Sequence, residues 1–373
     1  MSSPNGMVKD LQLAKITKQG IEIISYDSIT DACVWKKSII KRDVVKRDDF
    51  KEAKFNKFLK NTARHSKEEI EKDRYRSQIT SLGYMMHSYV VPTKTKLCIS
   101  LDERLTDSLS KDGQSGKTLK QKAIEQIKPC ALITGESFDP KSTFAWQQLD
   151  KDTVVVIIDD IGEDFDFDNF NSLLSIGIGV EKKYGHKFHI PQHLMPKFIF
   201  STNRTPKQIL GATREERQHI QEFSDYYTIK KEEGIREPIV DEFGEMFFDE
   251  WDTDEWQKFD WFMLNCIVTH LKDGLIQAEP VAVANNAIMQ QFGREIHHFL
   301  FEEEVIKLGI TYTSKELYQE FTGEEGNPDR TELGNTMKKL KPAIRLYCEF
   351  KKWKCIEKRG KRGTILEIKA KVV

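Results

Sequence analysis

The sequence predicts an α/β protein built around a parallel sheet, and three stretches carry that prediction. The apolar runs 153–158 and 197–200 are too short for helices and are rich in β-branched or aromatic residues. Neither run alternates apolar with polar residues, so we expect strands buried on both faces, as in parallel sheets covered by helices. A glycine-rich stretch, 113–118, lies upstream of both runs. Because ligands of such folds bind at the carboxyl ends of the strands, the polar residues that end each run are the first site candidates.

The composition is that of a soluble globular chain with room for two or three domains. Of the 373 residues, 31% are charged and 39% hydrophobic. No apolar run approaches the roughly 18 residues that a membrane span requires. The N-terminus lacks the apolar core of a secretion signal, and the six cysteines show no C-x-x-C spacing. We therefore expect a cytoplasmic protein with free thiols, no structural zinc and no membrane partner.

The net charge of −1 hides a strong segregation of charge along the chain. Residues 232–260 carry twelve acids against two bases, whereas residues 337–373 carry thirteen Lys or Arg against three acids. Residues 36–75 carry fourteen bases against eight acids. This segregation indicates basic modules that contact a polyanion, beside an acidic connector. For residues 36–75, an ordinary solvated surface is the alternative.

The N-terminal region, residues 1–94, is expected to be mostly helical. Apolar residues recur at helical spacing from about Phe50 and again from Ile70 to Tyr89, which predicts two helices with a basic outer face. A central sheet is expected to follow. Its predicted elements are a strand at 96–101, a helix from 118 to about 127, a strand at 131–134, a helix at 143–150, and the two apolar runs already described.

The glycine-rich stretch is a candidate phosphate loop. Its residues are Gly113, Gln114, Ser115, Gly116, Lys117 and Thr118. Small residues let backbone N–H groups converge on phosphate oxygens ahead of a helix N-terminus. Lys117 would neutralise the β- and γ-phosphates, and the Thr118 hydroxyl would hold Mg²⁺. Lys111 stands where the usual first glycine belongs, and a surface Gly-Ser-Gly turn is the alternative interpretation.

Polar residues end both apolar runs. Asp159 and Asp160 follow the first run directly, and carboxylates at a buried strand end are costly without a cation partner. One acid, Asp159, would hold Mg²⁺ while the other orients or activates the attacking water. Asn203 ends the second run and would polarise that water or sense the γ-phosphate. The alternatives are a strand-terminating turn and a turn-capping asparagine.

Between the acids and the asparagine, residues 179–190 predict a β-hairpin, because apolar ends flank Gly185 and a polar tip. The residues of the tip are Lys182, Lys183, Tyr184, His186 and Lys187. Cations interleaved with aromatic rings suit single-stranded DNA, whose bases stack on rings and whose phosphates pair with cations. A solvated basic hairpin is the alternative.

In their order, these motifs resemble those of superfamily 3 helicases, and more closely the helicase half of primase-helicases from phages and mobile elements. The resemblance covers about residues 70–275. The matching stretches are DGQSGKTL, VVVIIDDI, VEKKYGHKFHIP, PKFIFSTN, EFSDYY and DEFGEMFFDEWDTDEW. The resemblance implies an AAA+-like P-loop ATPase domain, here residues 95–275, whose lid includes a helix from Trp256 to Leu275. It also implies ATP and Mg²⁺ as cofactors and a homo-oligomeric ring, usually a hexamer, on single-stranded DNA.

The resemblance also implies roles for single residues. Lys117 and Thr118 would bind the nucleotide, Asp159 and Asp160 would be the metal and catalytic acids, and Asn203 would sense the γ-phosphate. The DNA-gripping residues of the hairpin tip would be Lys183, His186 and Lys187, with Lys182 beside them.

An arginine that reaches a neighbouring subunit's nucleotide is implied as well. Arg217 is the best placed and Arg214 the runner-up; a helix-surface salt bridge with Glu215 or Glu216 is the alternative. Members of the family often carry a primase ahead of the motor. Residues 1–94 are too few for one, so any primase would act in trans.

Residues 276–373 predict a helical connector and a winged-helix domain. Ser314 would cap a helix to about Phe321, a longer helix follows from 331 toward 353 with Pro342 as a kink point, and 354–369 predict a hairpin. Helix, helix and hairpin is typical of winged-helix domains. The bases of the hairpin turn, which would contact the backbone of single-stranded or duplex DNA, are Lys358, Arg359, Lys361 and Arg362. A small interaction domain with a basic loop is the alternative.

The resemblance therefore implies an ATP-dependent DNA helicase motor in the replication of a phage, plasmid or other mobile element. Two alternatives share its residues. One is an ATPase that loads or remodels replication proteins on DNA without unwinding it. The other is a non-catalytic DNA-binding initiator with a degenerate ATPase core, which Lys111 would favour.

Overall fold

The computed structural model describes residues 12–29, 39–65, 69–87, 89–91, 94–104, 115–206, 217–326, 330–360 and 363–371. The chain divides into two compact units. The first comprises residues 1–161, 167–203 and 219–279, and the second residues 162–166, 204–218 and 280–373. Within the described ranges, no helix has the length and apolar character needed to cross a membrane.

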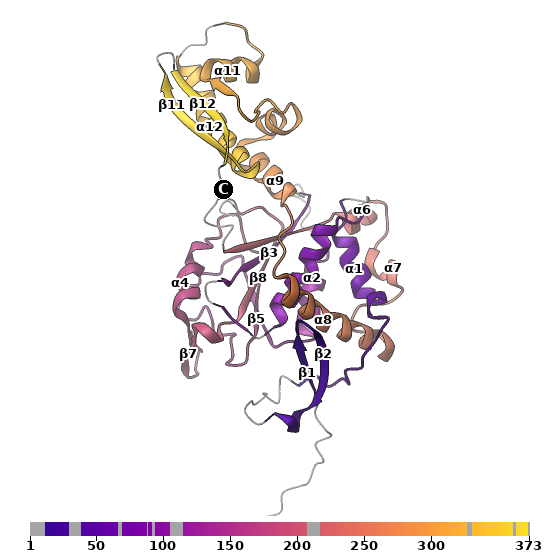
Figure 1. Cartoon of the computed structure of the whole chain (residues 1–373). Helices are drawn as coiled ribbons and strands as arrows, with labels where there is room; N and C mark the ends of the chain where they lie inside the picture. Colours follow the sequence, from indigo (N-terminus) through magenta and orange to yellow (C-terminus); the bar gives the residue numbers. More distant parts are fainter. Residues whose placement is uncertain are drawn as a thin grey trace, which may run out of the picture. The chain divides into compact units, whose positions relative to one another are not determined.

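A five-stranded sheet organises the first unit (Figure 1). Its strands, in the spatial order β4-β5-β8-β3-β9, are Cys130–Thr134, Val155–Asp159, Lys197–Thr202, Leu97–Asp102 and Gln218–Phe223. β8 pairs in parallel with both β5 and β3, and β4 pairs in parallel with β5. β5 and β8 are buried along almost their whole length, which confirms the prediction of covered parallel strands. The edge strand β4 alternates instead, with Leu132 exposed.

One predicted helix in this unit is wrong. Residues 143–150 form successive tight turns rather than an α-helix. Their backbone N–H groups bond three residues back, as Gln147 does to Phe144. Trp146 is buried edge-on against Phe170 and Phe198, and its indole N–H donates to the carbonyl of Pro140. Leu149 is buried as well, so the segment packs through two apolar side chains without forming an α-helix.

Helices pack beside the sheet: α1 (Lys54–Thr62), α2 (Lys72–Met86), α3 (Lys117–Glu125), α6 (Tyr226–Glu232), α7 (Pro238–Phe243) and α8 (Thr253–Asp273). The two helices predicted between residues 50 and 91 are therefore present as α1 and α2. They share one apolar core with α8. A Cβ atom on Gly83 of α2 would lie 2.1 Å from the carbonyl oxygen of Cys266, so the close approach of α2 and α8 requires glycine there.

The chain reaches α1 through a β-hairpin, β1 (Gln12–Thr17) with β2 (Gly20–Ser25), followed by the 3₁₀ turns η1 (Tyr26–Ser28) and η3 (Phe50–Glu52). Figure 1 shows this hairpin beside α8, and both of its strands contact that helix. The N-terminal region thus contains strands as well as helices. Its helices and α8 belong to the same compact unit.

Acidic residues around α8 pair with basic residues before and within α1. The pairs are Arg42 with Asp260, Arg47 with Asp254, Lys54 with Glu245, and Lys57 with Glu242. The nitrogen–oxygen distances of these four pairs lie between 2.6 and 3.4 Å. Four of the fourteen bases of residues 36–75 therefore have acidic partners within the chain.

The predicted hairpin between the two apolar strands is confirmed. β6 (Gly177–Glu181) and β7 (Lys187–Pro191) pair antiparallel, with Glu181 opposite Lys187. The helix α4 (Asp168–Ile176) leads into it, and the 3₁₀ turn η5 (Gln192–Leu194) leads from it to β8. The whole insertion therefore connects the carboxyl end of β5 to the amino end of β8.

The second unit begins with α9 (Val281–Phe292), α10 (Arg294–His297) and a π-helical turn, η6 (His298–Glu302). Then follow β10 (Thr311–Thr313), α11 (Ser314–Thr322), α12 (Arg330–Phe350), β11 (Trp353–Gly360) and β12 (Gly363–Ala370). β12 is the middle strand of an antiparallel sheet with β10 and β11. The predicted order of two helices and a hairpin is confirmed.

One local detail of the second unit differs from the predictions. The cap of α11 is Thr313 rather than Ser314, and it forms a reciprocal capping box with Glu316. Pro342 does not end α12, which continues to Phe350. Leu340, Ile344 and the buried face of α12 pack in the core of this unit with Leu366 and Ile368 of β12.

Candidate active site

Gly116 belongs to the candidate phosphate loop, and its backbone has a conformation that only glycine adopts readily. It caps α3 with φ at 96°, and a Cβ atom there would lie 2.5 Å from Cζ of Phe58. Ser115 before it and Lys117 after it are buried, whereas Thr118 is exposed in the first turn of α3. The candidates Gly113 and Gln114, together with Lys111, lie outside the described residues.

Lys117 holds the site together. Its ammonium donates to the Asp102 carboxylate, to the Thr202 carbonyl oxygen at 2.9 Å and to the Asn203 side-chain oxygen at 2.7 Å. An ammonium group has three N–H donors, so these three acceptors use all of them. Burial lowers the pKa of Lys117, and the opposing attraction of Asp102, Asp159 and Asp160 raises it. The lysine is thus a desolvated cation surrounded by acids from two strand ends.

The acidic pair lies at the end of β5 in two different environments. Asp159 is half-buried and accepts a hydrogen bond from the Ser201 hydroxyl of the neighbouring strand β8. Its backbone carbonyl accepts from the Gly135 N–H at 2.5 Å. Asp160 is exposed and has φ at 59°, in the left-handed region that aspartate tolerates better than most residues. The two carboxylates therefore differ in exposure and in their hydrogen bonding.

The order of the strands explains why these residues meet. β8 lies between β3 and β5, so Asn203 follows a strand whose neighbours end in Asp102 and Asp159. Because all three strands are parallel, their carboxyl ends share one edge of the sheet. The predicted residues Lys117, Asp159 and Asn203 are brought to this edge. Asp102 and Ser201 were not predicted.

A signal for Asp102 was present in the sequence. It ends the apolar run 96–101 in the same way that Asp159 ends the run 153–158. The charged stretch that follows it made it look like the start of a surface insert. Ser201 is a buried residue near the end of β8, and its hydrogen bond to Asp159 is what places it in the site.

The chemistry of this edge fits a phosphate group with Mg²⁺. The N-terminus of α3 and Lys117 offer positive charge, while Thr118, Asp159 and Asp102 offer the oxygen ligands that Mg²⁺ prefers. The Ser115 hydroxyl and Oδ1 of Asp102 are buried without a hydrogen-bond partner among the residues that the structure describes. No cluster of three or more His, Cys, Asp or Glu side chains suited to a metal occurs in that part of the chain. A metal at Thr118 and Asp159 would therefore need further ligands, such as phosphate oxygens and water.

The tip of the β6–β7 hairpin divides the predicted DNA-binding residues into two groups. Lys182 pairs with Asp150 and Lys187 with Glu181, each at 2.6 Å. Lys183 and His186 are exposed, and the Lys183 ammonium lies 5.6 Å from the ring centroid of Tyr184. Tyr184 is 98% exposed, and its own backbone is in the left-handed region, with φ at 63°. Lys187 is also exposed despite its ion pair, so the outward-facing residues are Lys183, Tyr184, His186 and Lys187.

The remaining predicted residues lie in the second unit. Arg217 is half-buried directly before β9, and Arg214 lies outside the described residues. On the β11–β12 hairpin, Lys358 pairs with Glu367 at 2.6 Å and Arg359 is exposed. Lys361 and Arg362 of the turn lie outside the described residues.

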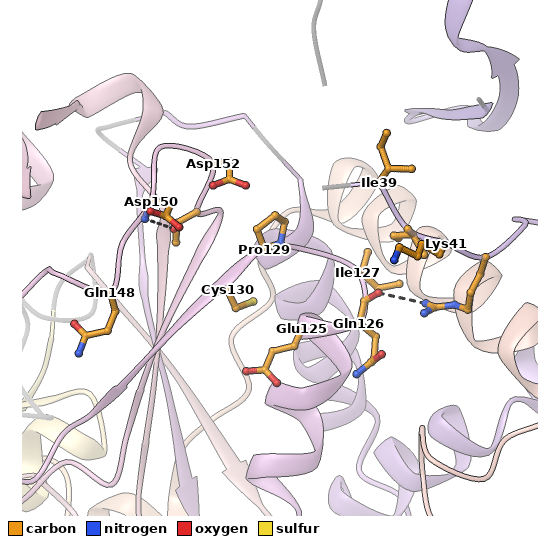
Figure 2. A pocket seen from close by; sticks show the side chains of 13 residues that line it. Ile39, Lys41, Glu125, Gln126, Ile127, Pro129, Cys130, Gln148, Asp150 and Asp152 are labelled. Carbon is orange, nitrogen blue, oxygen red and sulfur yellow. Dashed lines mark hydrogen bonds between the residues drawn. The ribbon is translucent and has the colours of Figure 1, made fainter. Parts of the chain in front are cut away.

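A cavity of about 320 Å³ lies elsewhere in the first unit. Figure 2 shows its lining, which includes Glu125 and Gln126 at the end of α3, Cys130 at the start of β4, and Asp150 and Asp152 before β5. It therefore adjoins the amino ends of β4 and β5, whereas Lys117 lies at the opposite end of α3. The cavity belongs to a different edge of the sheet from the candidate site.

Comparisons with known proteins identify no family. No protein-family model and no curated protein matches the chain. Two solved structures of one protein are similar, the apo A form of the NrS-1 C-terminal region and the same form of its residues 305–718. The first has a TM-score of 0.38 and 10% identity and covers 97% of this chain and 83% of that one. The second has a TM-score of 0.39 and 10% identity, with 88% and 77% covered. The function is therefore argued from the residues of this chain.

Proposed function

We propose that the chain is an ATP hydrolase that moves along single-stranded DNA, a helicase motor for the replication of a phage, plasmid or other mobile element. The observation that carries the proposal is the meeting of Lys117, Asp159 and Asn203 at the carboxyl ends of three parallel strands. A helix N-terminus with a lysine, an acid pair and a neutral amide are the groups that phosphoryl transfer to water uses.

Each of these groups has a role that its geometry supports. The backbone N–H groups at the start of α3, together with Lys117, would bind the β- and γ-phosphates of ATP. Thr118 and Asp159 would hold Mg²⁺, which when bound neutralises charge on the phosphates. Asp160 would orient the attacking water, since it is exposed while Asp159 is tied to Ser201. Asn203 would contact the γ-phosphate through the amide that now binds Lys117.

The hairpin supports movement along DNA. Its two strands are inserted between the acid-ended strand β5 and the asparagine-ended strand β8, so the connection through α4 begins at the phosphate site, directly after Asp159 and Asp160. Tyr184 would stack on a base while Lys183 and His186 pair with the backbone, a sequence-tolerant mode of binding. A change at the γ-phosphate would then move the DNA-contacting tip through α4.

The assembly is part of the same proposal. Motors of this type work as rings, and we propose a homo-oligomer, a hexamer, in which Arg217 reaches the nucleotide of a neighbouring subunit. The basic hairpin β11–β12, in a winged-helix arrangement, would add contacts to single-stranded or duplex DNA through Arg359 and the bases of its turn. A primase would act in trans.

The test measures ATP turnover with and without single-stranded DNA. Lys117→Ala should abolish turnover, and unchanged hydrolysis would overturn the assignment of the site. Lys183→Ala combined with Tyr184→Ala should keep the basal rate and lose the stimulation by DNA. The matched control, Lys141→Ala with Lys272→Ala, removes two exposed lysines away from the hairpin and should behave like the wild type.

One observation favours a second function. Lys182 and Lys187 are neutralised by Asp150 and Glu181, which leaves the tip less charged than its sequence indicates. A weaker grip suits an ATPase that loads or remodels replication proteins on DNA. A strand-displacement assay separates the two: turnover stimulated by DNA without displacement of a paired strand would favour the remodelling function.

A further inference from the structure

Asp102 has no assigned role in the proposed reaction, yet it is the charged partner of Lys117. It is the last residue of β3, and its side chain is only 12% exposed. The lysine side chain is 6% exposed. A buried acid and a buried base in direct contact form a strong pair, because removing either leaves the other charge desolvated and alone. When no ligand is bound, the anion that Lys117 contacts is therefore the Asp102 carboxylate.

Lys117 has no donor left for a phosphate. Its three N–H groups go to Asp102, to the Thr202 carbonyl and to Asn203. A phosphate that uses Lys117 must displace at least one of these acceptors. The carbonyl belongs to a strand and stays in place, whereas the two side chains can turn. Of these two, only Asp102 is negatively charged and would repel the incoming phosphate.

We propose that Asp102 competes with phosphate for Lys117 and that a divalent cation resolves the competition by taking over the Asp102 carboxylate. The inference rests on the proposed nucleotide site and adds a positioning residue to it. In the empty site Asp102 holds Lys117. With nucleotide and Mg²⁺ together, the lysine turns to the phosphates and the carboxylate faces the cation or its water shell.

A second observation marks Asp102 as the residue that would face the cation. Its Oδ1 atom is buried and has no hydrogen-bond partner in the described ranges. A carboxylate oxygen in that state is costly unless a donor or a cation satisfies it. Asp102 and Asp159 each accept one hydrogen bond from a side chain, Asp102 from Lys117 and Asp159 from Ser201. Asp102 keeps a buried oxygen that can face a cation beside Asp159.

The consequence is a dependence on Mg²⁺ that Asp102 creates. Without the cation, a nucleotide must enter beside an uncompensated carboxylate. Asp102→Asn should therefore bind metal-free nucleotide about tenfold more tightly than the wild type, a difference of about 1.4 kcal/mol. The factor by which Mg²⁺ tightens binding should fall to the same extent. A purely structural ion pair predicts equal factors in both proteins.

The experiment is a fluorescence titration of the full chain with methylanthraniloyl-ATP, first in EDTA and then in Mg²⁺. The matched control is Glu103→Gln, which neutralises the next residue along the chain, an acid that pairs with Arg74 at 3.2 Å. This control should keep the Mg²⁺ factor of the wild type. Equal factors in the wild type and Asp102→Asn would overturn the inference while leaving the nucleotide site intact. Absence of binding by the wild type in both buffers would overturn the proposed function and the inference together.

A second measurement tests the inference if Asp102→Asn folds poorly. In EDTA, inorganic pyrophosphate should raise the thermal unfolding temperature of Asp102→Asn or Asp102→Ser more than that of the wild type, since pyrophosphate would bind the freed lysine. Stabilisation equal to that of the wild type counts against the inference. If both variants unfold, the wild type alone decides: pyrophosphate must bind at least tenfold more weakly in EDTA than with Mg²⁺, and equal binding overturns the proposal.

Discussion

Replacing Lys197 by Met should change how the stability of the first unit depends on pH. Lys197 opens β8, is 3% exposed, and donates to the carbonyl oxygens of Tyr84, at 2.5 Å, and of His87. It thereby satisfies carbonyls at the end of α2 that have no partner within the helix. Both acceptors are neutral, so burial lowers the pKa of Lys197 to about 6. The unfolded chain keeps an ordinary lysine pKa of 10.5.

The sign of the effect follows from proton binding. Between pH 6 and the unfolded pKa, the unfolded chain holds a proton that the folded chain has released, so raising the pH stabilises the fold. This stabilisation is lost as the pH falls through 10.5 toward 6. With a folded pKa of about 6, the gain between pH 6 and 8 amounts to about 2 kcal/mol. Lys197→Met lacks this titration, so the difference in stability between wild type and variant should shift by that amount.

Urea unfolding at half-unit pH steps from 6 to 8 measures the effect, with tryptophan fluorescence as the probe. Four tryptophans of the first unit (146, 251, 256 and 261) dominate the signal from the described residues. The control, Lys141→Met, removes an exposed lysine and should follow the wild type at every pH. A constant difference between wild type and Lys197→Met across the series would refute the reasoning, because it would show that Lys197 titrates normally when folded.

Two further predictions concern packing and charge. Gly83→Ala should destabilise the first unit by at least about 2 kcal/mol in thermal unfolding, because its methyl group would meet the Cys266 carbonyl; Gly334→Ala, in the helix α12 with open space around it, should be neutral or slightly stabilising, and equal effects would contradict the close-approach argument. Arg42→Met should cost about 3 kcal/mol by leaving Asp260 buried without its partner, and adding Asp260→Asn should recover part of that loss. A double-mutant cycle with no coupling between the two would show that the pair does not stabilise the fold.

Strands, site helix and hairpins were predictable because their signals are local. The apolar run before Asp159 reads as a buried strand whichever strands flank it, and the step from Gly116 to Lys117 marks a helix start. The hairpin around Gly185 follows in the same way from apolar ends and a polar tip. In each case the physical cause lies within about ten residues of the element.

What could not be predicted depends on partners distant in the chain. Residues 143–150 form turns instead of the predicted helix, and Trp146 in them packs against Phe170 and Phe198 from distant elements. Asp102 reads as the start of a surface insert until β3 and β8 pair and bring it to Lys117. The acidic partners of Arg42 and Arg47 lie in α8, about two hundred residues away along the chain. A single sequence gives no direct signal of such contacts.

The position of β8 between β3 and β5 also has a consequence for the order of folding. Neither β3 nor β5 can complete its pairing until β8 has joined the sheet. β8 lies about a hundred residues after β3 in the sequence. Contacts between segments so far apart form slowly, because a long loop must close first. During synthesis, the phosphate loop and the first acids would leave the ribosome well before the strand that unites them. A nascent chain that ends before β8 would therefore expose Lys117, Asp159 and Asp160 before the candidate site can assemble.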